Sequence, residues 1–357
     1  MKKSNMQTVG IDIGDRFSQI CVVGEQDGEV EVFETTEIPS TKAAVSRYFS
    51  SRSPMVVALE VGTHSPWMSK VIEESGHEVL IANSRKTRFI YESDDKMDRT
   101  DAEKLARVAR ADRKLLFPIK HRAKEIQSML ALVRSRDILV GARSKLINHV
   151  RGVVKSSGDR LPSCSAERFH RHKERIPQEL EAALSTVMES IEGLTDKIRG
   201  MDRKIEDISK DKFPEVETLR QVPGIGPVTA LAYILTIGDP HLFSNNRKVG
   251  KYLGLTPKKD ESGESNPQLR ITRAGNKYTR SLLICCAHYI LGRFGPDSDL
   301  RSYGMRIAAR GGKNAKKRAA VAVARKLSVL LLSLWKSGEE YQPFQNKNQR
   351  TKDKEAA

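Results

Sequence analysis

Short apolar runs alternate with amphipathic segments from residue 7 to about residue 113, a pattern that predicts an α/β domain. The predicted elements are, in chain order, strands at 8–13, 18–23 and 29–35, a helix at 41–49, a strand at 55–61, a helix from about 65 to 76 and a strand at 77–82. A capping box at residues 100–103 predicts one more helix, which begins at Asp101.

The order of these elements, three strands and then helix, strand, helix, strand and helix, is that of the ribonuclease H-like fold. That fold carries one catalytic acid on its first strand, a second at the end of the strand after the first helix, and the rest on a late helix. Asp12, Glu60, Asp98 and Asp101 occupy those places. Carboxylates at the ends of buried strands are costly unless a cation neutralises them. We therefore interpret the four acids as ligands of two divalent metal ions that would serve phosphoryl transfer.

Two plainer interpretations of these acids remain open. The segment 10–14, with Asp12 at its centre, also resembles the phosphate-binding turn of actin-like sugar kinases, although the sequence shows no good second phosphate loop and no adenosine motif. Asp98 and Asp101 could simply favour the positive end of a helix dipole, by about 0.3–1 kcal/mol. The joint placement of the four acids favours a metal site over both.

The middle of the chain predicts helices. Residues 121–157 form one long basic helix in this interpretation, and residues 158–178 a polar, flexible crossing. Apolar residues then recur at alternating spacings of four and three, at Leu180, Leu184, Val187, Ile191, Leu194, Ile198, Met201, Ile205 and Ile208. This is the pattern of a coiled-coil seam. The seam could pair with the chain's own basic helix or with another subunit, and the two arrangements are compatible.

The composition changes after Pro214, where residues 219–230 resemble a helix-hairpin-helix turn. Gly224 and Gly226 in this turn would leave backbone N–H groups free for a DNA phosphate. An ordinary turn between two helices uses the same glycines, so this alternative stays open.

The remaining segments complete a division of the chain into four parts. Two helices are predicted at about 277–292 and 314–336, which makes the C-terminal domain mostly α-helical, and the tail is charged and predicted to be disordered. The parts are a catalytic α/β domain at 1–115, a basic helix and coiled-coil region at 116–212, a C-terminal domain at 213–341 and the tail at 342–357.

Charge points to a polyanionic partner. The net charge is +17, from 62 Lys and Arg against 45 Asp and Glu, although a merely basic protein has this balance too. The bases cluster, because nine Lys and Arg stand against three acids between residues 122 and 160. The four cysteines form no CxxC pair or Cys/His set for zinc. Without a signal peptide or an apolar stretch long enough to span a bilayer, we expect a cytoplasmic protein that binds no membrane.

An ordered set of motifs resembles the DEDD transposases of bacterial insertion sequences. The motifs are Gly10-Ile11-Asp12-Ile13-Gly14, Leu59-Glu60, Asp98-Arg99-Thr100-Asp101-Ala102, Pro223-Gly224-Ile225-Gly226, Tyr252-Leu253-Gly254-Leu255-Thr256-Pro257, and Ser262-Gly263 followed by Arg270-Ile271-Thr272-Arg273-Ala274-Gly275-Asn276. They cover about residues 7 to 340 in the right order. The resemblance implies a RuvC-like catalytic domain, followed by a coiled coil and a small transposase domain.

The resemblance also implies a recombinase that uses a structured non-coding RNA, the bridge RNA, to choose its donor and target DNA. The four acids would hold two Mg²⁺ ions, with Mn²⁺ as the alternative, and a C-terminal serine would join covalently to DNA. Ser262 matches the motif position of that serine. Because Glu261 precedes it where many relatives have a hydroxyl residue, Ser265 is the alternative nucleophile.

Basic residues are expected to hold the nucleic acids. Those near Ser262 that would clamp DNA are Arg270, Arg273, Lys277 and Arg280, and those that would hold an RNA or DNA backbone are Arg134, Arg136, Arg143 and Lys145. We expect a homo-oligomer, a dimer or a tetramer, assembled through the coiled coil. Two other functions stay open: a metal-dependent Holliday-junction-type nuclease without a covalent serine, and a non-catalytic nucleic-acid-binding protein with a decayed nuclease fold.

Overall fold

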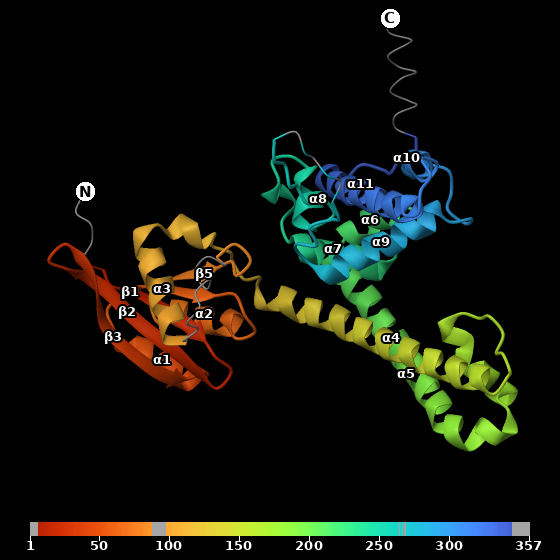
Figure 1. The fold of residues 1–357 in the computed structure, drawn as a ribbon, viewed down its shortest axis with the longest axis horizontal. Helices are drawn as coiled ribbons and strands as arrows, with labels where there is room; N and C mark the ends of the chain where they lie inside the picture. Colours follow the sequence, from red (N-terminus) through yellow and green to blue (C-terminus); the bar gives the residue numbers. More distant parts are fainter. Residues whose placement is uncertain (1–5, 88–97, 264, 266, 268, 345–357) are drawn as a thin grey trace, which may run out of the picture. The chain divides into compact units, whose positions relative to one another are not determined.

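A computed structural model of the protein describes residues 6–87, 98–263, 265, 267 and 269–344 (Figure 1). The chain divides into two compact units, residues 1–122 and 123–357. The second unit contains the predicted coiled-coil region from residue 123 onward and the predicted C-terminal domain. The division between those two stays a prediction. None of the described helices is both long and apolar enough to cross a membrane.

The first unit is a mixed sheet covered by helices. Its elements are β1 (Thr8–Ile13), β2 (Phe17–Gln26), β3 (Glu29–Pro39), α1 (Lys42–Ser50), β4 (Val56–Glu60), α2 (Ser65–Glu74), β5 (Glu78–Ala82), α3 (Asp98–Ala111) and the 3-10 helix η2 (Arg113–Leu116). The strand order is β3-β2-β1-β4-β5. β1 pairs antiparallel with β2 and parallel with β4, and β4 pairs parallel with β5. The predicted α/β class and the predicted order of elements are therefore confirmed.

The two faces of the sheet have different partners because side chains alternate along each strand. Val9 and Ile11 of β1 enter a core with the buried side chains of α1 and α2. Gly10, between them, faces α3: a Cβ atom there would lie 1.9 Å from the backbone oxygen of Ala102. The missing side chain therefore lets α3 lie directly on β1 (Figure 1).

Helix α3 begins earlier than the capping box predicts. Its first residue is Asp98 rather than Asp101, so Asp98 is the start of the helix and not a residue before it. Both acids then fall in the first turn, where carboxylates favour the positive end of the helix dipole. Thr100 lies inside α3 and is therefore not the N-terminal cap that the capping box predicts.

The second unit opens with a long antiparallel helical hairpin (Figure 1). Its helices are α4 (Lys124–Ser156) and α5 (Gln178–Lys212). Arg136 of α4 pairs with Asp202 of α5, and Arg143 pairs with Thr195, which fixes opposite chain directions. The chain's own basic helix is thus a partner of the predicted seam, and a partner in another subunit stays a prediction.

Of the two rows of apolar residues that make up the predicted seam of α5, the structure buries one. One set of heptad-spaced residues is buried as expected: Leu184, Ile191, Ile198 and Ile205. The other predicted set is only half-buried, namely Leu180, Val187, Leu194, Met201 and Ile208. In its place, α5 buries Met188, Thr195 and Ser209. The two hydroxyls tolerate burial because each donates to a carbonyl of its own helix, Thr195 to Ile191 and Ser209 to Ile205.

The predicted flexible crossing between these helices is instead a packed cap. It contains the 3-10 helix η3 (Ala166–Arg175), whose Phe169 is fully buried against α4 and α5. The guanidinium of Arg151 lies 5.0 Å from the centre of the Phe169 ring. It also donates to the carbonyls of Leu161 and Pro162. The mostly polar composition of the segment gave no indication in the sequence that Phe169 would be buried.

The rest of the second unit is helical, as predicted. Its elements are α6 (Glu215–Arg220), α7 (Pro227–Ile237), the 3-10 helix η4 (Pro240–Leu242), α8 (Lys248–Tyr252), α9 (Lys277–Leu291), α10 (Asp299–Ala308) and α11 (Ala315–Ser337). Helix α7 is central, since every residue from Thr229 to Ile237 is buried. The predicted disordered tail starts as packed chain, because the carbonyl of Pro343 accepts a bond from the amide of Asp299. Residues 345–357 of that tail lie outside the described residues.

We predict that Gly10→Ala separates α3 from the sheet. The added Cβ would meet a backbone oxygen that no side-chain rotation can move, so the free energy of unfolding should fall by at least about 1–3 kcal/mol. Gly62→Ala is the matched control, because a Cβ at Gly62 meets nothing within 4 Å. Thermal unfolding of both variants measures the effect, and equal melting temperatures would contradict the proposed packing.

Candidate active site and nucleic-acid interface

Asp12 and Glu60 leave neighbouring strands on the same face of the sheet. β1 and β4 run parallel with Ile11 opposite Leu59, so Asp12 and Glu60 each follow one residue later. Ala58 packs with α3 residues, and Glu60, two positions on, shares that face. Asp12 shares a face with Gly10 for the same reason. Both carboxylates therefore lie at the carboxyl ends of their strands, on the α3 side, and both residues are half-buried.

Helix α3 supplies the other two acids. Asp101 precedes the buried Ala102, which packs at Gly10, and its side chain is only 18% exposed. Its Oδ1 lies 3.8 Å from Nζ of Lys104. Asp98 begins α3 three residues earlier, a spacing that places residues on one side of a helix. The side chain of Asp98 lies outside the described part of the structure.

The donor chemistry of these acids fits a hard divalent cation, although a complete metal cluster is not assembled in the described residues. Asp12, Glu60 and Asp101 offer carboxylate oxygens, the ligands that Mg²⁺ prefers. Among the residues whose side chains the structure describes, no group of three or more His, Cys, Asp or Glu could together hold a metal ion. The fold thus brings the strand acids and the α3 acid to one face, and the metal set remains a prediction.

Ser262 and Ser265 lie together in a loop formed by the described residues between 256 and 272, which we call the serine hairpin. Its arms are held by bonds from the amide of Lys258 to the carbonyl of Arg270, 2.9 Å, and from Thr272 to Thr256, 2.9 Å. At the tip, Ser262 and Ser265 exchange backbone hydrogen bonds of 3.3 and 3.0 Å. Gly263 has a φ of +54°, which suits glycine in a tight turn. Both serines are exposed, so either hydroxyl is accessible to a large substrate.

Two of the sequence motifs meet at the base of the serine hairpin. A Cβ at Gly254 would lie 2.2 Å from the carbonyl oxygen of Ala274, and one at Gly275 would lie 2.1 Å from that of Tyr252. The two segments therefore pack backbone against backbone, which explains why each needs a glycine. Nη1 of Arg280 donates to the carbonyls of Leu253, 3.0 Å, and Ala274, 2.8 Å.

Arg280 therefore has a structural role in place of the expected contact with DNA. Its side chain was expected to clamp DNA, but the residue is only 8% exposed and its guanidinium joins the two segments under the hairpin. Asn276, which is not among the predicted site residues, helps to fix the start of α9 next to Arg280. Its side chain accepts from the amides of Tyr278 and Thr279 and so caps α9. An asparagine just before a helix is a detectable capping signal.

Three of the predicted DNA-clamping residues remain available at the surface. Arg270, Arg273 and Lys277 are exposed around the base of the serine hairpin. Arg273 has a φ of +55°, a conformation that is uncommon for a residue with a side chain. Nearby, burial raises the pKa of Tyr278 to about 12, so this ring stays neutral.

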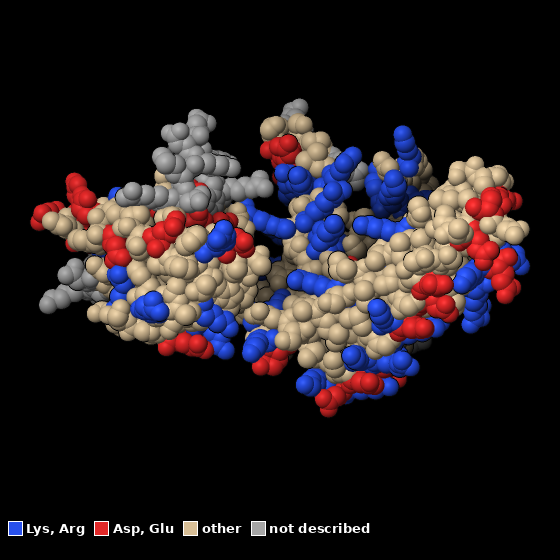
Figure 2. Space-filling model, turned by 90° about the horizontal axis from the view of Figure 1, so that it is seen from below, with Lys and Arg blue, Asp and Glu red and all other residues tan. Residues whose placement is uncertain are grey.

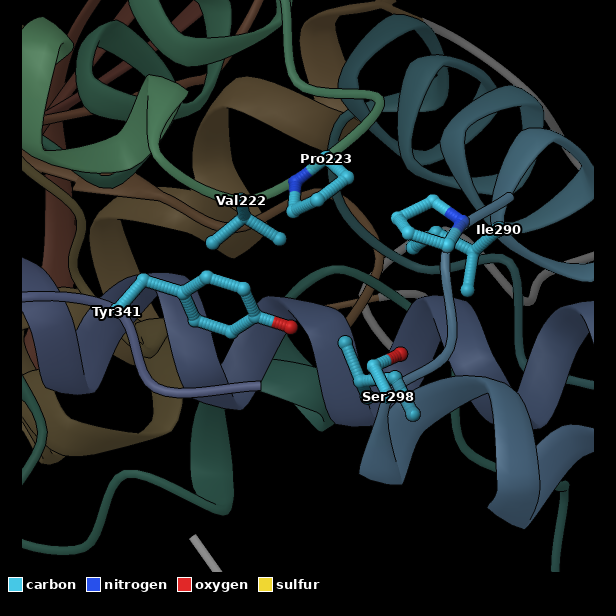
Figure 3. A pocket seen from close by; sticks show the side chains of 7 residues that line it. Val222, Pro223, Ile290, Ser298 and Tyr341 are labelled. Carbon is cyan, nitrogen blue, oxygen red and sulfur yellow. The ribbon is translucent and has the colours of Figure 1, made fainter. Parts of the chain in front are cut away.

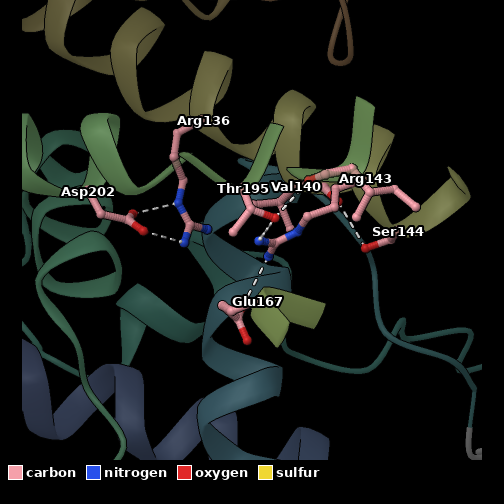
Figure 4. Close-up of polar contacts among 8 residues, drawn as sticks. Arg136, Val140, Arg143, Ser144, Glu167, Thr195 and Asp202 are labelled. Atoms are coloured by element: carbon pink, nitrogen blue, oxygen red, sulfur yellow. Dashed lines mark hydrogen bonds and ion pairs between the residues drawn. The ribbon is translucent and has the colours of Figure 1, made fainter. Parts of the chain in front are cut away.

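The basic residues of α4 divide into exposed ones and structural ones, and Figure 4 shows the contacts of the structural Arg136 and Arg143. Arg143 is buried, and its guanidinium donates to Thr195 Oγ1 at 3.3 Å and to Glu167 Oε1 at 3.1 Å. Arg136 makes two bonds to Asp202, of 2.8 and 3.3 Å. The expected backbone-binding role is therefore replaced for Arg143 by a role in joining α4, α5 and η3, and Arg136 is engaged in a hairpin ion pair. Arg134 and Lys145 are exposed.

The polar environment of Glu167 is consistent with its role in this cap. A backbone hydrogen bond at Glu167 itself, together with contacts from Ser165 and Arg143, lowers the pKa of its carboxyl. The carboxylate therefore stays ionised beside Arg143.

Elsewhere on the second unit, Lys and Arg side chains project into solvent (Figure 2).

The glycine turn between α6 and α7 has one packed side and one open side. Gly224 has a φ of +89°, and a Cβ there would lie 2.6 Å from the Tyr289 ring. Gly226 precedes α7 without a side-chain cap. Behind the turn, Val222 and Pro223 line a cavity of about 10 Å³ with Ser298 and Tyr341 (Figure 3). That volume holds at most about one water. A phosphate could therefore approach the turn only from its outer side. The helix-hairpin-helix interpretation stays a prediction.

Two segments of the chain match models of known protein families. Residues 9–157 match the DEDD transposase domain of the IS110 type, described as a transposase. Residues 216–303 match the transposase IS116/IS110/IS902 family. The two matched segments cover the acids and the serine hairpin respectively. The two matched segments together identify the class of protein as an insertion-sequence transposase.

Similar proteins support the same assignment. The transposase for insertion sequence element IS1111A of Coxiella burnetii is 26% identical over 345 residues, covering 94% of this chain and 92% of that protein. A probable family 20 transposase of Pseudomonas aeruginosa is 26% identical over 351 residues, covering 95% and 99%. A pilin gene-inverting protein of Moraxella bovis is 30% identical over 164 residues, covering 43% and 49%. The chain belongs to the IS110/IS116/IS902 family of insertion-sequence transposases.

We predict that Arg143→Ala lowers the free energy of unfolding by about 1–3 kcal/mol, because it removes bonds from the buried Thr195 and from Glu167. Lys145→Ala, two residues later on the exposed side of α4, should change it by less than about 0.5 kcal/mol. Urea unfolding followed by circular dichroism compares the two. Equal midpoints would show that Arg143 does not hold the hairpin together.

Proposed function

We propose that the protein cuts and rejoins DNA at the ends of an insertion sequence by phosphoryl transfer, with Ser262 as the nucleophile. The observation that carries this proposal is the shared face of Asp12 and Glu60 at the ends of β1 and β4, directly beside the first turn of α3. Membership of a transposase family supports DNA as the substrate. We expect the reaction to take place in the bacterial cytoplasm, on nucleoid DNA.

The acids would act as the metal-holding set. Asp12, Glu60, Asp98 and Asp101 would bind two Mg²⁺ ions, or Mn²⁺. Such ions supply Lewis-acid stabilisation of the phosphoryl and leaving oxygens when they are bound. The half-buried positions of the strand acids keep their carboxylates partly shielded from water, which strengthens their attraction for a cation.

The serine would carry the covalent step. Ser262 Oγ would attack the phosphorus of the scissile phosphate, losing its proton as the new Oγ–P bond forms. The P–O bond to the departing strand would break, and that oxygen would take up a proton. A hydroxyl from a second DNA strand would later displace the serine, which restores Ser262 and joins the strands. The exposed tip of the serine hairpin supports this role, and Ser265 across the turn is the alternative.

Other surfaces would hold the nucleic acids. Arg270, Arg273 and Lys277 would contact DNA phosphates beside the serine hairpin, and the outer side of the Gly224–Gly226 turn could contact another. Arg134 and Lys145 would hold the backbone of DNA or of a structured guide RNA, which the family resemblance implies. Sequence choice would then lie in base pairing to that RNA. The relative named as a pilin gene-inverting protein supports exchange between two DNA sites.

Assembly would use α5. Its half-buried apolar residues at heptad spacing, Val187, Leu194, Met201 and Ile208, lie beside the intramolecular seam. Such residues can support further helix packing. A dimer or tetramer would bring several active sites to one DNA junction.

Removing one strand acid tests the metal-dependent chemistry. We predict that Asp12→Asn lowers cleavage of element-end DNA by at least about 100-fold, while DNA binding in a mobility-shift assay stays within a few-fold of the unmodified protein. Asp15→Asn is the control, because that carboxylate is 95% exposed and should change cleavage little. Full cleavage by Asp12→Asn, or cleavage that survives EDTA, would refute metal catalysis at this face.

A covalent-trapping assay tests the serine. The protein, its element RNA, Mg²⁺ and labelled element-junction DNA are run on a denaturing gel beside Ser262→Ala and Ser265→Ala. We expect a protein–DNA band that Ser262→Ala abolishes and Ser265→Ala retains. The reverse pattern would move the nucleophile to Ser265. Cleaved DNA without any covalent band would instead indicate a metal-dependent nuclease that needs no serine.

A further inference from the structure

We propose that a groove on the second unit, separate from the serine hairpin, binds a single-stranded polynucleotide. The groove lies along α11, with α10 and residues 341–343 on one side and residues 246–247 on the other. We call it the α11 groove. Its volume is about 560 Å³, which lies within the range of roughly 300–1,000 Å³ for ligand sites. Helices α8 and α10 each pack against α11 (Figure 1).

One face of α11 forms the floor of the groove. The lining residues recur at spacings of three and four, namely Ala322, Arg325, Lys326, Val329, Leu330 and Ser333, so they share one side of the helix. The opposite side of α11 carries the buried Val323, Leu327 and Leu331. The groove therefore has a fixed floor that belongs to the core-packed helix, and its lining mixes apolar surface with basic and hydroxyl groups.

The walls are also fixed. Nζ of Lys336 donates to the carbonyl of Phe243, 2.8 Å, and to Asn246 Oδ1, 2.9 Å, so the segment that carries Arg247 is tied to α11. On the other side, the carbonyl of Pro343 accepts from the amide of Asp299 at 2.8 Å. A preformed site loses little entropy when it binds a ligand.

The charge of the groove favours an anion. Arg247, Arg325 and Lys326 line it and are exposed, while Asp299 is its one lining carboxylate. None of the three bases forms an ion pair with a carboxylate among the described residues. Unpaired cations in a groove attract a polyanion more strongly than bases already engaged in salt bridges.

Arg325 and Tyr303 give the groove a restricted arginine and an aromatic ring in addition to its positive charge. A Cβ at Gly250 would lie 3.0 Å from Cγ of Arg325, so the arginine stem rests closely on α8 and its direction is restricted. Nζ of Lys326 lies 4.2 Å from the centre of the half-buried Tyr303 ring. An aromatic ring beside a basic track is the usual platform for an unstacked base, and Arg and Lys beside it contact the phosphates.

These features favour a single strand over the other candidate occupants. A duplex offers phosphates but keeps its base faces stacked, so it could not use Tyr303. The chain's own segment 345–357 carries four Lys and Arg against two Asp and Glu, and its charge therefore opposes docking in a basic groove. The mixed lining of charged, hydroxyl and apolar groups matches a nucleotide strand, which has phosphates, sugars and flat bases.

Binding of labelled oligonucleotides tests the inference with the full-length protein. Fluorescence anisotropy is measured in EDTA with fluorescein-labelled oligo(dT) and oligo(U) of about 16 nucleotides, and with a duplex of the same length. We expect the double variant Arg325→Glu/Lys326→Glu to weaken single-strand binding by at least about tenfold. The slope of log affinity against log salt should flatten by about 1.4, since each single-strand phosphate contact contributes roughly 0.7.

Two further variants separate the groove from general electrostatics. Lys42→Glu/Arg47→Glu makes the same charge change at exposed positions of α1 and should weaken single-strand binding by less than about threefold. Tyr303→Leu keeps the charge and removes the ring, and should weaken single-strand binding by about fivefold or more while sparing the duplex. A preference for oligo(U) or oligo(dT) identifies the strand as RNA or DNA.

Specific outcomes would overturn the inference. Equal losses in the groove and α1 double variants would show that only net charge matters. An unchanged single-strand affinity in Tyr303→Leu, together with equal losses for duplex and single strand in Arg325→Glu/Lys326→Glu, would show a surface that attracts any polyanion. Because the assay contains no metal and needs no cleavage, failure of the proposed serine chemistry would leave its result intact.

Discussion

The contact between α3 and β1 is the constraint on which the proposed active site of this transposase depends. Acids on strands and an acid on a helix can share a substrate only if the helix lies directly on the sheet. Gly10 permits that approach, because any side chain at this position would overlap the backbone of Ala102. The glycine and Asp12 stand two residues apart on the same face of β1. One short segment thus provides both an acid and the space for the helix that carries its partners.

Backbone packing also organises the serine half of the protein. Gly254 and Gly275 let two loop segments touch, and Arg280 then donates to a carbonyl from each segment. Both arms of the serine hairpin leave from this junction. The motif residues around the serine therefore have a structural task before any chemical one: they fix where the exposed tip begins. An exposed tip on a fixed base would suit the proposed nucleophile, which must reach a large substrate.

Burial divides the basic residues into two groups with different physical roles. Arg143 and Arg280 satisfy carbonyls, hydroxyls or carboxylates inside the second unit, where a loss would leave polar groups unpaired. Arg134, Lys145 and Arg270 stay exposed and can exchange counterions for phosphates. The high positive charge thus overstates the surface available for nucleic acid, because part of it stabilises the helical hairpin and the loop junction.

The sequence by itself determined the α/β class, the order of elements, the helical remainder and the family, because hydrophobic periodicity and motif order are local properties of the chain. It also predicted the strand-end positions of Asp12 and Glu60. Tertiary structure decided which residues face each other. It moved the second row of the α5 seam to Met188, Thr195 and Ser209, it buried Arg143 and Arg280, and it packed the crossing on Phe169. These outcomes depend on contacts between segments far apart in the chain, where a polar residue can be buried as long as a distant group completes its hydrogen bonds.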